Sequence, residues 1–291
     1  MGPFRVARFA REMEAAVIHT QLSTAAWHGS LAGRLTGLPV VAHVRALNRP
    51  GWYRLARRVI AVSHAVKDHL VALGMPAERV DVVYNAVDPD RYYLPCTRQE
   101  ARGRLALPED ATVVGVVAHL TEKKGHAVFL EAFARVAGRH PRAVALFLGE
   151  GPEREALSAQ AKASGLAGRV LFAGFHRDVL PFYAAMDLVV LPSIEGEGLP
   201  RALLEGGLLG RPTLGTRLSG VPEIVREGES GFIVPVRDPQ ALAEKLEVLL
   251  ADPALRERMG AAGREYISAT FTVEAMVNGT LETYRRAGVR S

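Results

Sequence analysis

Residues 187–205, DLVVLPSIEGEGLPRALLE, combine a short apolar run, a glycine-rich turn and two spaced carboxylates, and we call them the double-glutamate segment. The apolar run at 187–191 consists mainly of Leu and Val and is ended by Pro192, which is typical of a parallel strand buried on both faces. The glycines of EGEG permit a tight turn, and Pro200 suits the first turn of a helix that starts near residue 199. The segment therefore predicts a strand, a turn and a helix in direct succession.

Two carboxylates of this segment, Glu197 and Glu205, are expected at the mouth of the predicted helix and inside it. Their spacing slightly exceeds two helical turns, so they share roughly one face and lie about 12 Å apart along the axis. That separation suits two ends of one elongated ligand better than one metal ion. Two structural alternatives stay open: Glu197 as a helix cap, and Glu205 as a surface residue. The apolar neighbours of Glu205 favour a carboxylate that needs a partner, such as a sugar hydroxyl.

The composition indicates a globular protein, since 291 residues with 48% hydrophobic content suffice for two ordinary domains. No apolar run approaches the length of a membrane span, and the amino terminus carries charges where a signal peptide would be hydrophobic. The single cysteine, Cys96, excludes an intramolecular disulfide and a cysteine zinc cluster. A cytoplasmic location is the simplest expectation.

The charge balance is slightly basic, with 36 Lys and Arg against 31 Asp and Glu and a net charge of +5. Basic residues are not interleaved with aromatic ones and no recognition motif is present, so we expect no nucleic-acid partner. Arg5, Arg8 and Arg11 alternate with apolar residues that include Phe9 and Met13. This pattern fits either a small basic helix that touches the inner membrane face weakly or an ordinary surface helix on a sheet.

Strand-like and helix-like segments alternate along the chain, which predicts an α/β fold with parallel sheets. Residues 84–98 are rich in turn formers and mark an inter-domain link. We therefore expect domains at 1–94 and 95–271, with a final helix at 272–291. In the first domain, the predicted strands are 15–19, 39–44, 58–62 and 79–83, and the helices are 4–14, 24–35 and 63–73. In the second, the strands are 112–118, 143–148, 170–173, 188–191, 212–215 and 232–234, and the helices are 125–137, 152–163, 179–185, 199–209, 222–226, 239–250 and 253–266.

Unusual polar groups in the second domain follow predicted strands, where open α/β sheets bind ligands. The first strand is followed by AHLTEKKGH, which places His119 at the strand exit and Lys124 before a helix. A lysine beside free helix amides is a good site for phosphate oxygens, although a solvated lysine in a polar loop is the open alternative. GEGPERE and AGFHRD follow the second and third strands, and the double-glutamate segment contains the fourth.

Several of these motifs together resemble a known family, the retaining, GT-B-type glycosyltransferases of "group 1", also called family 4. The matching segments are EGLPRALLE with GRPTLGTRLSGVPEIVREGESGF, AHLTEKKGH, GEGPERE, RVLFAGFHRDV, DLVVLPS, RVIAVSHAVKDHL and VVYNAVD. The resemblance runs from about residue 10 to the final helix. It implies a GT-B-like fold of two facing Rossmann-like domains, with the amino-terminal, acceptor-side domain incomplete.

The resemblance also implies donor-binding roles for residues of the second domain. Glu205 is expected to bind the ribose hydroxyls, backbone amides near Gly198 and Leu199 the donor sugar, and Phe175 to contribute to the same site. The terminal helix is expected to cross back to the first domain.

The catalytic residues implied by the resemblance are Lys124, His119 and Glu197. Lys124 would hold the diphosphate and Glu197 the sugar or the side of its phosphate. His119 occupies a slot where the family usually has arginine, and a neutral imidazole supplies less charge to the leaving group. We hypothesise that this change makes turnover fall above neutral pH.

Two further departures concern the first domain. The histidine expected near the reaction centre is ambiguous, because AHVRAL offers His43 and Arg45. Arg45 occupies the matching slot by spacing, and His43 is expected to point to the other face of the strand; both are possible acceptor-side residues. The strand and glycine-rich loop with which the family usually begins have no counterpart here.

The sequence thus predicts a hexosyltransferase that uses a UDP-, GDP- or ADP-sugar and a glycan or glycolipid acceptor, as in polysaccharide assembly. Retention of configuration follows from the resemblance alone. No cofactor or metal is expected, since no Asp-x-Asp pair ends a strand. The alternatives are a non-catalytic nucleotide-sugar or carbohydrate binding module, and a subunit that needs a second chain for activity.

Overall fold

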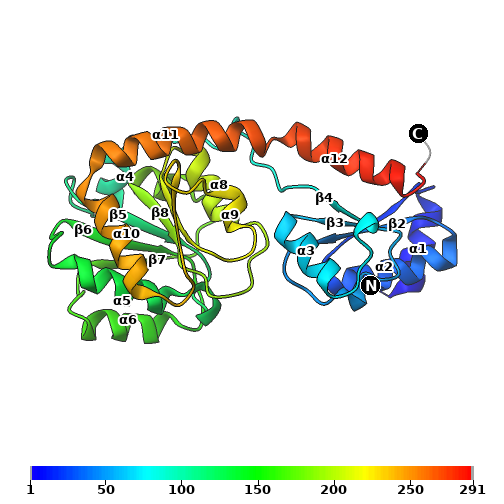
Figure 1. The fold of residues 1–291 in the computed structure, drawn as a ribbon, viewed down its shortest axis with the longest axis horizontal. Helices are drawn as coiled ribbons and strands as arrows, with labels where there is room; N and C mark the ends of the chain where they lie inside the picture. Colours follow the sequence, from blue (N-terminus) through cyan, green and yellow to red (C-terminus); the bar gives the residue numbers. More distant parts are fainter. Residues whose placement is uncertain (1, 290–291) are drawn as a thin grey trace. The chain divides into compact units, whose positions relative to one another are not determined.

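The computed structural model of the chain describes residues 2–289 and divides them into two compact units, each built on a parallel sheet (Figure 1). The first unit contains residues up to Ala86 together with Glu197–Leu199 and the segment from Phe271. The second contains Val87–Gly196 and Pro200–Thr270. The expected link at 84–98 falls at this division, but residues 87–94 group with the second unit, because the Tyr92 hydroxyl bonds to Glu205 there.

The first unit has a four-stranded parallel sheet in the order β1-β2-β3-β4, so β1 is an edge strand. Strand β1 begins three residues later than predicted. The strands are β1 (Ile18–Gln21), β2 (Val40–Val44), β3 (Arg58–Ala61) and β4 (Val80–Val82). The helices are α1 (Pro3–Glu12), α2 (Ser23–Thr36), α3 (His64–Ala72) and α12 (Val273–Arg286), with short 3₁₀ turns at Pro50–Trp52 and Ala77–Arg79.

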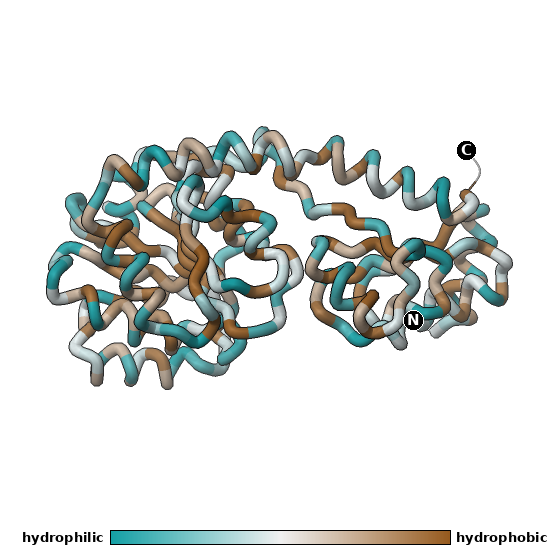
Figure 2. The backbone as a smooth tube through the Cα atoms, viewed as in Figure 1, coloured by the Kyte–Doolittle hydropathy of each residue, from teal (hydrophilic) through white to brown (hydrophobic). Residues whose placement is uncertain are grey.

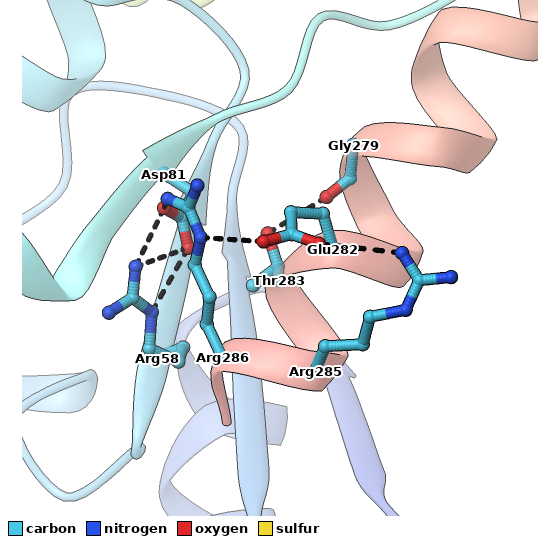
Figure 3. Close-up of polar contacts among 7 residues, drawn as sticks. All are labelled: Arg58, Asp81, Gly279, Glu282, Thr283, Arg285 and Arg286. Carbon is cyan, nitrogen blue, oxygen red and sulfur yellow. Dashed lines mark hydrogen bonds and ion pairs between the residues drawn. The ribbon is translucent and has the colours of Figure 1, made fainter. Parts of the chain in front are cut away.

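Helix α12 belongs to the first unit. It packs on one face of the sheet through Met276, Tyr284 and Ala287, which contact Val41 and Ile60. A charged cluster fixes its carboxy-terminal end (Figure 3). Asp81 accepts three hydrogen bonds from Arg58 and a fourth, of 2.9 Å, from Arg286 of the helix. Both apolar burial and a shared carboxylate therefore hold α12 to this sheet.

The second unit has six parallel strands in the order β10-β9-β8-β5-β6-β7, which confirms the predicted doubly wound domain. Hydrophobic residues dominate these strands (Figure 2). They are β5 (Thr112–Val117), β6 (Ala143–Leu148), β7 (Val170–Gly174), β8 (Leu188–Leu191), β9 (Thr213–Thr216) and β10 (Gly231–Val234). The helices are α4 (Arg98–Arg104), α5 (His126–Ala137), α6 (Arg154–Ala163), α7 (Leu180–Ala185), α8 (Arg201–Leu208), α9 (Val221–Ile224), α10 (Pro239–Ala251) and α11 (Pro253–Thr270), with a 3₁₀ turn at Glu122–Lys124.

Helices cover both faces of the six-stranded sheet, because successive strand residues point to opposite sides (Figure 1). Val190 joins the core that α5, α6 and α10 form on one face. Its neighbour Val189 faces α8, where Gly206 leaves no room for a side chain. Helix α11 packs on α8 at Gly207 and Ile267. The double-glutamate segment is thus a buried strand, a loop and a buried helix, as predicted.

Further local predictions were wrong in detail. Pro200 is the amino-terminal cap of α8 and the helix begins at Arg201, one to two residues later than expected. Helix α4 was not predicted, although Thr97 and Glu100 form a complete capping box at its start. Helix α11 continues to Thr270, beyond the predicted end at residue 266.

Candidate functional site

The order of strands in the second unit reverses between β5 and β8, which are direct neighbours. Chain connections leave such a point in opposite directions, so the loops after the two strands diverge and a crevice forms at the carboxyl ends. The loop after β5 carries His119 and Lys124, and the loop after β8 begins the turn of the double-glutamate segment. This place in the sheet is where ligands of doubly wound folds are held.

The two loops are fastened to each other at Gly125. This glycine has a φ of 67°, and a Cβ atom built on it would lie 2.0 Å from the carbonyl oxygen of Pro192. The Ile194 amide donates a 2.8 Å hydrogen bond to the carbonyl of Lys123. Lys123 also forms a 3.3 Å ion pair with Glu195, although both side chains are exposed. Close backbone approach therefore fixes the half-buried Lys124 beside the loop that follows β8.

His119 lies at the exit of β5 and is exposed. One ring nitrogen, Nδ1, is 3.4 Å from the carbonyl oxygen of Glu150 in the loop after β6. Gly149 and Gly151 allow that loop to pack on the β5 loop, since Cβ atoms there would meet the carbonyls of Ala118 and Leu120 at 2.0 and 2.2 Å. The two glycines therefore allow the backbones of the two loops to lie in direct contact. The imidazole of His119 lies beside them and faces solvent.

Phe175 follows strand β7 and is 65% exposed. Strand β7 is at the edge of the sheet, and β6 separates it from β5. The loop that carries Phe175 is thus two strands away from the point of reversal, whereas Lys124 lies directly at it.

Glu205 is buried in α8 and its two carboxylate oxygens are bound by protein groups. Oε1 accepts 3.0 Å hydrogen bonds from Arg201 and from the Tyr92 hydroxyl. Oε2 accepts a 3.1 Å hydrogen bond from the Tyr183 hydroxyl, which also lies 3.2 Å from the carbonyl of Ala202. The expectation that this carboxylate needs a partner is confirmed, but the partners in the structure are two tyrosines and an arginine instead of a sugar.

The two tyrosines differ in their surroundings. Tyr183 is completely buried, and burial followed by the charge of Glu205 raises its pKa well above the usual value. Tyr92 is only partly buried, and the same two causes raise its pKa. Both phenols therefore keep their protons at neutral pH and donate to the carboxylate. Arg201 additionally donates a 2.6 Å hydrogen bond to the Tyr92 oxygen, so Tyr92 and Arg201 cover Oε1 as a pair.

Of these partners, sequence reasoning could have found only Arg201. It precedes Glu205 by four helical positions, a spacing that commonly forms an ion pair. Tyr183 lies in α7 and Tyr92 lies in the segment that we assigned to the link. Nothing in their local sequence signals a contact with a residue so distant along the chain.

The remaining predicted donor residues, Glu197, Gly198 and Leu199, lie in the loop between β8 and α8 and group with the first unit. Glu197 and Leu199 are buried. The turn before them requires glycine at position 196, where φ is 81°. Their predicted contacts with a donor sugar stay predictions.

Arg45 joins three strand ends of the first unit. Its guanidinium donates to the side-chain oxygens of Gln21 at 2.9 Å and of Asn85 at 3.0 Å. Gln21 ends β1 and Asn85 follows β4, so Arg45 is held at the carboxyl edge of the four-stranded sheet. The residue that takes the family's histidine slot by spacing is therefore placed among polar groups at a strand-end edge.

His43 is buried in β2, with its ring 5.6 Å from that of His19. Its pKa is lowered to about 4, mainly by burial and to a smaller extent by the charges of His19 and Arg45. Arg45 directly follows β2 and is the third cause of this decrease, and the prediction that His43 points to the other face of the strand stays a prediction. His43 is thus a neutral, buried residue next to Arg45.

Residues 2–289 contain no group of three or more His, Cys, Asp or Glu side chains placed to hold a metal ion. Within the same range, no helix is both long and apolar enough to cross a membrane. The strand-end loops of the second unit carry the half-buried Lys124 and the exposed His119 together with charged side chains of both signs, such as Lys123 and Glu195.

Comparisons with known proteins agree with this arrangement. The model of the family described as "Glycosyl transferases group 1" matches residues 97–266, and that of "Glycosyltransferase Family 4" matches residues 2–91. The lipopolysaccharide core biosynthesis glycosyltransferase LpsE of Rhizobium meliloti is 36% identical over 62% of this chain and 52% of its own length. The N-acetyl-alpha-D-glucosaminyl L-malate synthase of Bacillus anthracis is 30% identical over 76% of this chain and 57% of its own. This chain therefore spans little more than half the length of the curated relatives it matches.

Among solved structures, Anabaena HepE in complex with UDP and glucose superposes with a TM-score of 0.90. It is 26% identical, and the match covers 97% of this chain and 80% of HepE. The sucrose-phosphate synthase of Thermosynechococcus elongatus shares the fold, with a TM-score of 0.88. Two α/β units with parallel sheets and these neighbours confirm the predicted GT-B-like fold. The chain belongs to the family 4, or group 1, glycosyl transferases.

Proposed function

We propose that this chain binds a nucleotide sugar with its second unit and moves a hexose from it to a hydroxyl group of a glycan or glycolipid. The observation that supports the proposal is the junction of the β5 and β8 loops at the strand-order reversal, which fixes Lys124 at the edge of the sheet where doubly wound folds commonly bind ligands. HepE, at 26% identity, was solved with UDP, which supports a nucleoside diphosphate as the ligand of this fold. We further propose that UDP, GDP or ADP is the carrier and that the configuration at the sugar is retained.

The proposed chemistry rests on positioned positive charge. Departure of a nucleoside diphosphate develops negative charge on its β-phosphate, and a fixed cation or backbone amide that faces this charge stabilises the transition state. Lys124 supplies the cation, and His119 at the same strand exit supplies a hydrogen-bond donor. We propose that these groups act without a divalent metal. Transfer activity that survives EDTA would support this part, and loss of activity restored by added Mg²⁺ would contradict it.

For Glu205 the proposal requires a rearrangement. A ribose that binds this carboxylate must replace Tyr92 and Arg201 on Oε1, while Tyr183 keeps Oε2 in place. Replacement is feasible because the Arg201 side chain is 67% exposed and Tyr92 is only partly buried. Tyr183 is then a positioning residue for the ribose contact, and Tyr92 competes with the ribose.

The test is a panel of UDP, GDP and ADP and their sugars, scored by thermal shift of the purified chain and by release of the nucleoside diphosphate. We expect one base to raise the melting temperature more than the other two. Binding together with transfer to a glycan or glycolipid acceptor supports the enzyme. Binding without transfer favours the second candidate, a nucleotide-sugar binding module or a subunit that needs another chain.

We also propose a weak contact of α1 with an anionic membrane surface, which would suit a glycolipid acceptor. Phe4, Phe9 and Met13 are 76%, 58% and 64% exposed, and Arg5 and Arg8 are exposed on the same short segment. Co-sedimentation with vesicles that contain phosphatidylglycerol should exceed that with phosphatidylcholine vesicles. Equal sedimentation of a Phe4→Ser, Phe9→Ser double variant would contradict the contact.

A further inference from the structure

A cluster of four arginines lies at the edge of the six-stranded sheet opposite the strand-end loops. Asp187 directly precedes β8, and Arg211 closely precedes β9. Because all six strands are parallel, their amino ends meet at this edge, and Lys124 lies at the other. A cavity of about 60 Å³ opens here, lined by Arg98, Arg211 and Arg256 among others. We call these three residues, Arg102 and Asp187 the arginine cluster.

Asp187 is the buried carboxylate of the cluster and is already bound on both oxygens. Oδ2 accepts hydrogen bonds from Arg102 at 2.5 Å and from the backbone amide of Val113 at 2.6 Å. Oδ1 lies 3.2 Å from Arg98, whose side chain is half exposed. Arg102 also donates to the backbone carbonyls of Ala185 and Glu109, so its donors are largely used within the protein.

Arg211 and Arg256 are bound differently, because they donate to backbone carbonyls. Arg211 is 7% exposed and donates to Tyr183 and Ala184 at 3.2 and 3.3 Å. Arg256 donates through a single nitrogen, Nη1, to the carbonyls of Leu249 and Leu250. Within residues 2–289 neither guanidinium forms an ion pair with a carboxylate. Two positive charges therefore line the cavity beside a carboxylate that other groups already bind.

The local charge stays positive when all nearby acids are included. Glu257 lines the cavity, and Asp252 lies close enough to Arg256 to act on its pKa in the upward direction. Four guanidinium groups thus face three carboxylates, of which only Asp187 is buried. Burial, followed by the charge of Arg98, lowers the pKa of Arg211 to about 10. A buried charge without its own counter-ion is costly, and a bound anion would relieve this cost.

We propose that the arginine cluster is a binding site for a tetrahedral oxyanion, either inorganic phosphate or the terminal phosphate of a small phosphomonoester. Arginine suits this ligand, since its planar donor pairs match phosphate oxygens. Arg98, Arg211 and Arg256 are the residues that contact the anion, while Arg102 and Asp187 hold the frame. The site is separate from the proposed donor site, because strand β8 runs between the two edges of the sheet.

The test measures the melting temperature of the full chain with increasing sodium phosphate, against sodium chloride at matched ionic strength. Arg98→Gln is the main variant, because this side chain is half exposed and its removal leaves Arg102 on Asp187. Arg256→Met is the second, and Arg258→Gln, an exposed arginine of the same helix, is the matched control. Lys124→Met tests whether phosphate also binds at the other edge of the sheet.

We expect phosphate, compared with chloride, to raise the melting temperature of the wild type. The apparent Kd for phosphate should be at least about tenfold weaker in Arg98→Gln and in Arg256→Met, because each variant loses one charge-assisted hydrogen bond to the anion. Arg258→Gln should retain the wild-type Kd. Lys124→Met removes any phosphate bound at the proposed donor site, and in that background Arg98→Gln should weaken the remaining phosphate response by the same factor. Any other pattern, including the absence of a phosphate-specific shift in the wild type, overturns the proposal. Parallel titrations with inorganic phosphate and with glycerol 2-phosphate separate the two ligand sources: a shift with both assigns a phosphomonoester end, and a shift with phosphate alone assigns the free ion.

Discussion

The two tyrosines on Glu205 allow a sharp prediction, because they donate to different oxygens of one carboxylate. Tyr183→Phe removes a fully buried hydroxyl without leaving a cavity, so Oε2 loses its 3.1 Å donor. A hydrogen bond to a charged group contributes about 1.5–3 kcal/mol when its loss leaves a buried partner unsatisfied. Tyr92→Phe removes a partly buried hydroxyl from Oε1, where Arg201 remains as a donor at 3.0 Å. We expect this second change to cost less than about 1 kcal/mol.

The assay is urea denaturation of both variants, monitored by circular dichroism, which gives the free energy of unfolding of each. Tyr93→Phe is the matched control, because this neighbouring side chain is 61% exposed. The reasoning would be refuted if Tyr92→Phe destabilised the chain as much as Tyr183→Phe, or if neither differed from the control.

The same two variants also distinguish a hydroxyl that positions the Glu205 carboxylate from one that competes with the ligand for it. If Glu205 binds ribose, Tyr183→Phe should weaken nucleoside diphosphate binding, and Tyr92→Phe should leave it unchanged or strengthen it up to about tenfold. Isothermal titration calorimetry with the base that binds best measures both effects. Weaker binding in Tyr92→Phe would show that this hydroxyl contacts the ligand instead of competing with it.

Three further predictions concern groups around the two edges of the second sheet. Asp187→Asn should reduce the free energy of unfolding by about 3–5 kcal/mol, because it leaves the buried Arg102 without its carboxylate. Gly125→Ala should cost more than about 2 kcal/mol, since it combines a positive φ with a Cβ only 2.0 Å from the Pro192 carbonyl. Burial, followed by the charge of Lys124, lowers the pKa of His126 to about 4. The unfolded chain therefore binds more protons than the folded chain when the pH is below the ordinary histidine pKa of about 6.5. Stability from this group is complete above about pH 6.5 and is lost as the pH falls toward 4, by about 2 kcal/mol at pH 5.

Each of these predictions has a control in the same unit, measured by urea denaturation. Asp110→Asn breaks an exposed ion pair with Arg142 and should cost less than about 1 kcal/mol. Gly165→Ala shares a positive φ of 70° but has open space around it, so strain alone should cost about 1 kcal/mol. His126→Phe should reduce the loss of stability between pH 7 and pH 5 by about 2 kcal/mol, whereas His176→Phe at an exposed site should not change it. A contradiction would be a control that behaves like its partner variant.

Much of the fold follows from local patterns that the sequence shows directly. Continuous apolar runs ended by proline or glycine identify strands buried on both faces, and the run before Pro192 is one of them. Helix α4 escaped prediction because the chain around it is rich in turn formers. Its capping box at Thr97 and Glu100 was the available signal. Strand β1 was expected too early, since the apolar run begins at Ala15, three residues before the first paired residue, Ile18.

The candidate site was predictable only where its chemistry is local. The phosphate loop could be found because lysine, glycine and a helix start lie within a few residues of one strand. The environment of Glu205 could not, because Tyr183 and Tyr92 reach it from segments far away along the chain. Tertiary packing determines which distant segments supply hydrogen-bond donors to Glu205, and a local sequence pattern does not predict this packing.

The most direct test of the central claim compares two adjacent lysines for their effect on nucleoside diphosphate binding. Lys124 is half buried at the strand-order reversal, and Lys123 is 64% exposed and paired with Glu195. Calorimetric titration should give a Kd at least about tenfold weaker in Lys124→Met than in wild type, and a Kd within about twofold of wild type in Lys123→Met. Equal affinities in the two variants would contradict a donor site built on Lys124.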